Sequence, residues 1–252
     1  MPLELTVTDG LYNHALEHTK TAKLLGIYIQ NNLQHQTTIK NIINKLQPAI
    51  QRFRYATTLE DTKRMLDLYY RDVYPHLIGA ISIWGSQSDT KEYLQPLIRT
   101  HKKIIRILHR APPRAPTAPL MLQLSILSLA SLFTHRVCAE MHPYIHPSTD
   151  KPLQRPHHNH TYITITNVHS HGTRYSANHL FAPNSHKYST TTPPICESTH
   201  HAQIHIDIWN ALPDTIKNIT SLPTFKKQLK KHLLEEQQNK LNSERQQGHH
   251  LA

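Results

Sequence analysis

The stretch from Thr62 to Arg110 reads TKRMLDLYYRDVYPHLIGAISIWGSQSDTKEYLQPLIRTHKKIIRILHR and carries the densest helical pattern of apolar residues in the chain. Its apolar residues recur at spacings of three, four and seven, which is typical of amphipathic helices. The first helix is interrupted at Pro75 and ends at Gly85, and a second helix begins after the Ser-Gln-Ser-Asp run. The residues of this second helix that we expect to face inward are Leu94, Leu97, Ile98, Ile104, Ile105 and Leu108.

Positive charge gathers on the opposite face of the second helix. At about 100° per residue, that face carries Arg99, Lys102, Lys103, Arg106 and Arg110. No Asp or Glu occurs between Glu92 and Glu140. Because a solvated helix face normally mixes signs, this face predicts a polyanionic partner, with an ordinary solvated surface as the alternative.

Composition favours nucleic acid or an anionic surface as a partner. The 252 residues carry a formal net charge of +11, with a pI near 9.6. The sequence holds no apolar run near the ~20 residues of a membrane span and no signal-peptide pattern. Only two cysteines occur, Cys138 and Cys196, which excludes a disulfide framework. We therefore expect no membrane contact and an intracellular protein, cytoplasmic or nuclear, that is not secreted.

The N-terminal part combines short strands with a helix. Alternating apolar residues in residues 1–35, around Val7 and around Ile27, predict strands of a small hairpin or of a sheet edge. A long amphipathic helix then runs from Ile39 to Phe53, with Thr37 or Thr38 as its N-cap. Pro48 is expected to kink or split this helix.

Beyond Arg110 the pattern changes several times. The proline-rich run 111–119 is expected to be a stiff, non-helical connector, and apolar helices should follow it up to residue 141. Residues 142–203 are rich in His, Pro and Thr and should be loose, because they lack apolar area. Residues 204–252 should hold an ordered Trp-Asn-x-Leu-Pro segment, a basic helix after Ser221 and a frayed tail after Glu235. The fold class is therefore mainly α, a helical bundle over 36–110 with a small N-terminal β part, a loose Pro/His-rich segment and a C-terminal helix.

The 22 histidines are the least usual feature of the composition. They occur together with abundant Thr, Pro, Gln and Asn, so a coding strand rich in A and C explains much of the excess. Cys196 with His200 and His201 is weak evidence for zinc, because no second cysteine lies nearby. No two aspartates are adjacent, so the sequence shows no carboxylate pair for two-metal catalysis. We therefore assign no metal ligand and no catalytic residue.

Several blocks, in their order along the chain, resemble the C-terminal part of LINE-type, non-LTR retrotransposon reverse transcriptases, especially jockey-like elements. KLLGIYI at 23–29 resembles the strand that follows the catalytic palm, and YPHL to IWG at 74–85 resembles the thumb. IWNALP at 208–213 resembles the family's C-terminal pattern. The residues that carry these motifs are Leu25, Gly26, Trp84, Gly85, Trp209, Asn210, Leu212 and Pro213.

The resemblance implies an RNA-directed DNA polymerase as parent, which would use Mg²⁺ in its palm. The chain is expected to begin after the family's Ala-Asp-Asp box, so that 1–35 is a palm remnant and 36–110 a thumb-like bundle. It would then need no cofactor and be inactive alone. It would bind RNA or DNA without sequence preference, and the missing palm would be a second partner. The alternatives are a His-rich metal-binding or protein-interaction module and a decayed, non-functional gene product.

Overall fold

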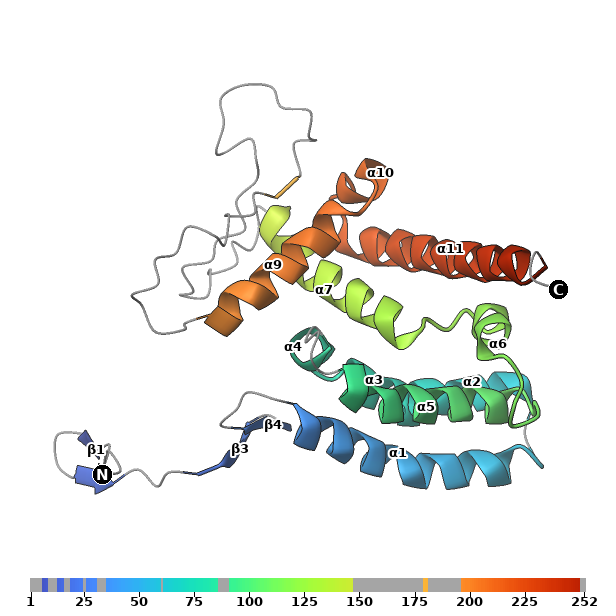
Figure 1. Cartoon of the computed structure of the whole chain (residues 1–252), viewed down its shortest axis with the longest axis horizontal. Helices are drawn as coiled ribbons and strands as arrows, with labels where there is room; N and C mark the ends of the chain where they lie inside the picture. Colours follow the sequence, from blue (N-terminus) through green and yellow to red (C-terminus); the bar gives the residue numbers. More distant parts are fainter. Residues whose placement is uncertain are drawn as a thin grey trace.

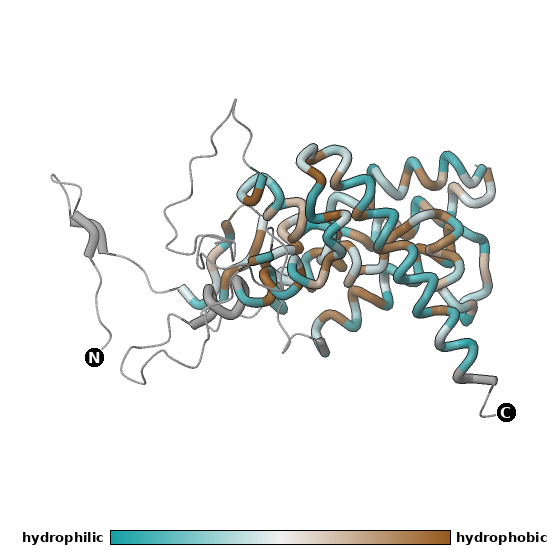
Figure 2. The backbone as a smooth tube through the Cα atoms, turned by 90° about the horizontal axis from the view of Figure 1, so that it is seen from above, coloured by the Kyte–Doolittle hydropathy of each residue, from teal (hydrophilic) through white to brown (hydrophobic). Residues whose placement is uncertain are grey.

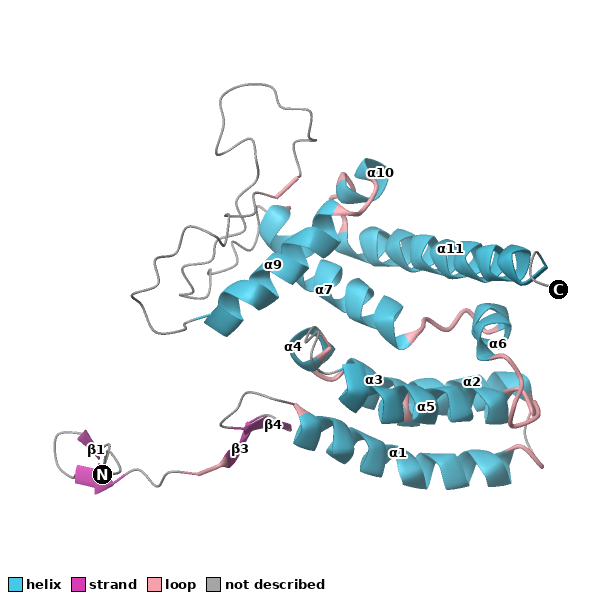
Figure 3. Ribbon diagram, in the orientation of Figure 1, coloured by secondary structure: helices cyan, strands magenta, loops and turns pink. Residues whose placement is uncertain are grey.

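Helices make up most of the chain that the structure describes (Figures 1 and 3). This computed structural model describes residues 6–8, 13–15, 19–24, 26–30, 35–59, 61–85, 91–146, 179–180 and 196–249. The prediction of a mainly α fold with small N-terminal strands is confirmed.

Two separate antiparallel hairpins precede the helices. β1 (Thr6–Thr8) pairs with β2 (Asn13–Ala15), and β3 (Thr21–Leu24) pairs with β4 (Ile27–Gln30). The two apolar runs of the sequence therefore lie in different hairpins and do not pair with each other. Gly26 turns the chain between β3 and β4 at φ +87°, a conformation that glycine adopts without strain.

Helix α1 (Gln36–Ala56) runs unbroken through Pro48, so the expected split does not occur. Buried residues on both sides of the exposed proline, Leu46 and Ile50, hold the helix against the core. The predicted threonine cap is also wrong, because the helix begins at Gln36. The Oγ1 of Thr38 instead accepts the Tyr28 N–H (2.9 Å) and donates to the Tyr28 carbonyl (3.2 Å), which ties β4 to α1.

The central stretch forms α2 (Thr62–Asp72), α3 (Tyr74–Ile78), α4 (Ile81–Trp84) and α5 (Lys91–Leu108). Asp61 caps α2 by accepting the backbone N–H of Arg64 at 2.8 Å. The predicted interruption at Pro75 is confirmed, since the proline stands in the first turn of α3. The shared apolar face of these helices follows the spacing seen in the sequence.

The proline-rich run is shorter than expected, because α6 (Thr117–Gln123) begins inside it. Pro119 lies in the first turn of α6, where the missing N–H would have no helical partner anyway. Helix α7 (Leu129–Ile145) follows, capped by the Ser128 hydroxyl, which accepts the Ser131 N–H at 3.2 Å.

The C-terminal part consists of α9 (Cys196–Asn210), α10 (Asp214–Lys217) and α11 (Leu222–His249). Both ends of the predicted loose segment 142–203 are thus helical, while residues 147–178 and 181–195 lie outside the described residues. The expected frayed tail is wrong too, because α11 continues to His249. Contacts within the helix, such as Gln238 Nε2 donating to Asn242 Oδ1 at 3.0 Å, accompany this hydrophilic end (Figure 2).

One hydrophobic core joins the helices that the structure describes between α1 and α11. α5 packs on α1 and α6, and α7 connects this group to α9 and α11 (Figure 1). The largest fully buried side chains are Trp84, Trp209, Tyr69, Phe53 and Phe225. None of the helices in the described ranges is long and apolar enough to cross a membrane.

Candidate nucleic-acid interface

Helix α5 is held on its apolar face by the core. Leu97, Ile104, Ile105 and Leu108 are buried as predicted, while Leu94 and Ile98 are half-buried. His101 lies on the same buried face, four residues after Leu97, and was not among the residues predicted to face inward. Its position in the apolar spacing of the helix could have predicted that His101 is buried.

His101 makes a buried hydrogen bond to α2. Its Nε2 lies 2.9 Å from the hydroxyl of Tyr69. Burial lowers the pKa of His101 to about 4, so the ring is neutral at pH 7. Burial, followed by the neighbouring Tyr70 and Tyr74, raises the pKa of Tyr69, so its hydroxyl stays protonated. The pair fixes the rotation of α5 about its axis and therefore which residues face outward.

Three of the predicted cations, Arg99, Lys102 and Lys103, are exposed on the side of α5 opposite this bond. Within the described part of the chain, no ion pair involves any of the three. Other exposed cations do have partners: Arg52 Nε lies 3.2 Å from an Asp72 carboxylate oxygen. The three side chains together form what we call the α5 cationic face.

Arg106 and Arg110 are placed differently. The Arg106 Nε donates to the Ala115 carbonyl at 2.8 Å, which ties the helix to the following connection. α5 ends at Leu108, and Arg110 lies beyond it at φ 52°, with its Nε donating to the Thr57 carbonyl at 3.1 Å. Both guanidinium groups therefore hold the end of α5 in place, and their role in nucleic-acid binding stays a prediction.

The motif residues that precede α5 pack in the core or form a turn. Trp84 is fully buried, and its Nε1 donates to the Gly79 carbonyl at 2.8 Å. A Cβ at Gly85 would lie 2.6 Å from the Ile81 carbonyl oxygen and 2.8 Å from Phe133 Cδ2, so only glycine fits there. Leu25 lies outside the described residues, and its neighbour Gly26 forms the β3–β4 turn.

The Trp-Asn-Ala-Leu-Pro segment connects the C-terminal helices to the core. Trp209 is buried and stacks on Phe225 of α11, with ring centroids 5.6 Å apart. Leu212 is buried beside it, and Pro213 directly precedes α10. This segment therefore joins α9, α10 and α11 to the core.

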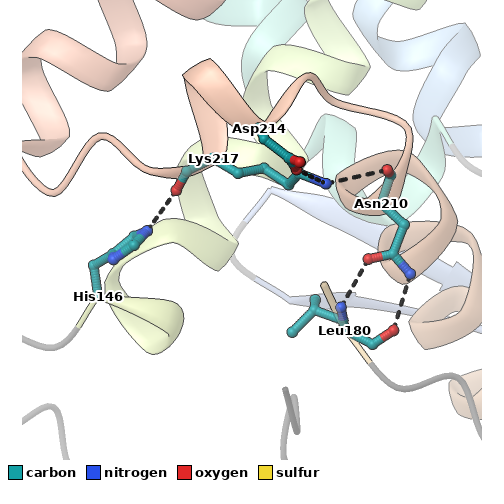
Figure 4. A network of polar contacts seen from close by, with 5 residues as sticks. All are labelled: His146, Leu180, Asn210, Asp214 and Lys217. Carbon is teal, nitrogen blue, oxygen red and sulfur yellow. Dashed lines mark hydrogen bonds and ion pairs between the residues drawn. The ribbon is translucent and has the colours of Figure 1, made fainter. Parts of the chain in front are cut away.

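The Asn210 side chain makes two hydrogen bonds to the backbone of Leu180, which lies 30 positions earlier in the chain (Figure 4). Its Oδ1 accepts the Leu180 N–H at 2.8 Å, and its Nδ2 donates to the Leu180 carbonyl at 2.9 Å. The nearby Lys217 is buried, with its Nζ 2.9 Å from Asp214 Oδ1 and 3.5 Å from the Asn210 carbonyl oxygen. His146 contacts the Lys217 carbonyl at 2.7 Å. The motif residues are thus explained by packing and hydrogen bonding.

A metal site is not found among the residues the structure describes: no three His, Cys, Asp or Glu side chains gather there in a ligand-like group. The histidines between 157 and 171, and the side chains of Cys196, His200 and His201, lie outside that part. Cys138 is buried, and burial raises the pKa of its thiol to about 12, so it is not a thiolate at pH 7.

Comparison of the chain with protein-family models, with curated proteins and with solved structures finds no match.

Proposed function

We propose that this chain is a thumb-like and C-terminal region of a non-LTR retrotransposon reverse transcriptase. In this proposal it holds a nucleic-acid duplex, RNA or DNA, through the α5 cationic face. The family part of the proposal is supported by the ordered motif blocks of the sequence. The binding part is supported by the geometry of α5.

The observation that carries the binding proposal is an exposed set of unpaired cations on a firmly anchored helix. Arg99, Lys102 and Lys103 have no carboxylate partner among the described residues, whereas α5 is fixed behind them by the core and by the Tyr69–His101 bond. Grouped like charges repel one another, which costs stability unless a polyanion neutralises them.

The spacing of these side chains suits a phosphate backbone. From Arg99 to Lys103 the helix rises about 6 Å. A duplex presents one phosphate charge per about 1.7 Å of its axis, so each cation can reach its own phosphate. Contacts of this kind position a duplex without reading its sequence.

The sequence does not supply the polymerase chemistry of the family. It contains no adjacent aspartates, and the described residues contain no group of possible metal ligands. We therefore expect no primer extension from this polypeptide alone. A palm supplied by another part of the polymerase would adjoin the β3–β4 hairpin, where Leu24 and Ile29 are 58% and 38% exposed.

The proposal is tested by measuring binding to short DNA and RNA–DNA hybrid duplexes of unrelated sequence by fluorescence anisotropy. We expect similar affinities for unrelated sequences and an affinity that falls steeply with salt. Failure to bind any duplex at low salt would overturn the proposal, and marked preference for one sequence would overturn its sequence-independent form.

A further inference from the structure

A small pocket opens between α2, α3, α7 and α11, on the other side of the bundle from the α5 cationic face. It is lined by three tyrosines, a histidine, a lysine and three aliphatic side chains: Tyr69, Tyr70, Tyr74, His135, Lys230, Ile126, Leu127 and Leu132. Tyr69 reaches His101 on the buried side of α5, so this pocket and the exposed cations face away from each other. Among the described residues, no carboxylate lines the pocket.

The tyrosines form a connected aromatic surface. The ring centroids of Tyr70 and Tyr74 lie 5.3 Å apart at 62°, and those of Tyr69 and Tyr70 lie 5.3 Å apart at 82°. Tyr69 is buried, whereas Tyr70 is 37% exposed and Tyr74 is half-buried. The two outer rings can therefore be contacted by a planar group from solvent.

A lysine of α11 lies against the outer ring. Lys230 Nζ lies 5.8 Å from the centre of the Tyr70 ring and 3.4 Å from its hydroxyl oxygen. Burial lowers the pKa of His135, the nearby Lys226, Lys230 and Arg136 lower it further, and its hydrogen bond to the Lys226 carbonyl at 3.2 Å opposes them. Lys226 stands one helical turn before Lys230 on the same side of α11. Arg136 is paired with Glu140.

Lys226 and Lys230 have no carboxylate partner among the described residues, and they stand four apart on α11. Like charges at this spacing destabilise a helix by a few tenths of a kcal/mol. The arrangement thus combines uncompensated positive charge with exposed aromatic rings.

A bare phosphate would use only the cations, and an apolar peptide would use only the rings. A nucleotide uses both, because it joins a planar base to a phosphate.

We propose that this pocket binds an unpaired nucleotide of a nucleic-acid strand, with its base against Tyr70 and Tyr74 and its phosphates on Lys226 and Lys230. This site is distinct from the proposed duplex site on α5 and takes a different form of nucleic acid. The pocket is small, so the base stacks on its rim and does not enter the core. Stacking on a π-face is tolerant of base identity, and little sequence preference is expected.

The test compares a single-stranded oligonucleotide with an abasic strand of equal length and charge. Tyr70→Leu keeps the site apolar but removes the ring, and Tyr55→Leu, at a tyrosine 72% exposed on α1, is the matched control. We expect Tyr70→Leu to weaken binding of the normal strand about tenfold. Binding of the abasic strand and of a blunt duplex should not change, and Tyr55→Leu should bind like the wild type.

Equal binding of normal and abasic strands by the wild type would overturn the proposal, as would an unchanged affinity of folded Tyr70→Leu. If Tyr70→Leu does not fold, the wild type decides the matter through photocrosslinking to a strand that carries 5-iodouracil. We expect the crosslink on the peptide that contains Tyr70 and Tyr74, and a crosslink confined to other peptides would overturn the site. Loss of duplex binding alone would contradict the function proposed for α5 and leave this site standing.

Discussion

The hydroxyl of Tyr69 and Nε2 of His101 lie 2.9 Å apart inside the core and join α2 to α5. Both side chains are almost completely buried, and their rings stack with centroids 6.0 Å apart. Because this bond positions the helix that carries the proposed duplex contacts, the ionisation of His101 should affect stability and, under the proposed function, duplex binding.

The stability of the fold should decrease in mild acid. The pKa of His101 is lowered from 6.5 to about 4 by burial, so the unfolded state takes up a proton before the folded state does. The contribution of the neutral ring is complete above pH 6.5 and is lost as the pH falls from 6.5 to 4, by about 3 kcal/mol. Urea denaturation at a series of pH values measures the loss. His101→Gln should flatten the profile, and a profile identical to that of the wild type would contradict this assignment.

The ion pair of Lys217 and Asp214 should respond unequally to removal of its two partners. The Lys217 side chain is 4% exposed and that of Asp214 58%. Asp214→Ala leaves a buried ammonium group without its carboxylate and should destabilise the fold by roughly 3 kcal/mol. Lys217→Met leaves only an exposed carboxylate and should cost less than about 1.5 kcal/mol. Chemical denaturation of both variants gives the comparison. A larger loss for Lys217→Met would show that the ammonium group is not the costly partner.

Ser125→Gly should stabilise the protein. The chain leaves α6 with Ser125 at φ 51°, where the Ile126 N–H bonds to the Met121 carbonyl at 2.8 Å. This left-handed helix end favours glycine, and the substitution should add about 0.5–1 kcal/mol. Ser243→Gly, in the exposed interior of α11, should lower stability by a similar amount. Thermal unfolding compares the two variants, and a shift in the same direction for both would contradict the account.

Gly85→Ala should destabilise the fold by about 1–3 kcal/mol, because the added methyl group would lie 2.6 Å from the Ile81 carbonyl oxygen. Gly79→Ala is the matched control, since its nearest neighbour, the Pro75 carbonyl oxygen, would be 3.2 Å away. Chemical denaturation should show the larger loss at Gly85. Equal losses would mean that the contact to Ile81 relaxes without cost.

Periodicity predicted the helices well where one face is buried. The apolar spacing of α5 predicted four of its buried residues, Leu97, Ile104, Ile105 and Leu108. The same reasoning missed His101. Its place in the apolar spacing predicts burial, but its hydrogen-bond partner Tyr69 lies on another helix and cannot be identified from spacing along α5. Hydrogen bonds between residues far apart in the sequence, such as those of Asn210 to Leu180, could not be predicted from spacing. Asn210 was identified only as part of a motif.

Helix boundaries were predicted less well, for a physical reason. The chain has only 6 glycines, and two helix ends use other residues in the left-handed conformation, Arg110 and Ser125. The usual stop signal is therefore absent from the sequence at these positions. Arg110 was expected on the face of α5 for this reason, whereas it belongs to the turn that ends the helix. In this turn the backbone N–H of Ala111 donates a hydrogen bond to the Arg106 carbonyl at 2.9 Å.

The most direct test of the proposed duplex contact is the salt dependence of binding by the triple variant Arg99→Gln, Lys102→Gln and Lys103→Gln. These substitutions keep helix propensity and leave the buried face of α5 unchanged. A second triple variant, Lys63→Gln, Lys240→Gln and Arg245→Gln, removes equal charge from exposed positions on α2 and α11.

Each lost phosphate contact reduces the slope of log K against log salt by about 0.9 on B-DNA. We predict that the α5 variant binds unrelated duplexes more weakly and that its slope flattens by about two to three. The control variant should keep most of the wild-type slope. A folded α5 variant with wild-type affinity and slope, or an equal loss in the control, would contradict nucleic-acid binding by this face.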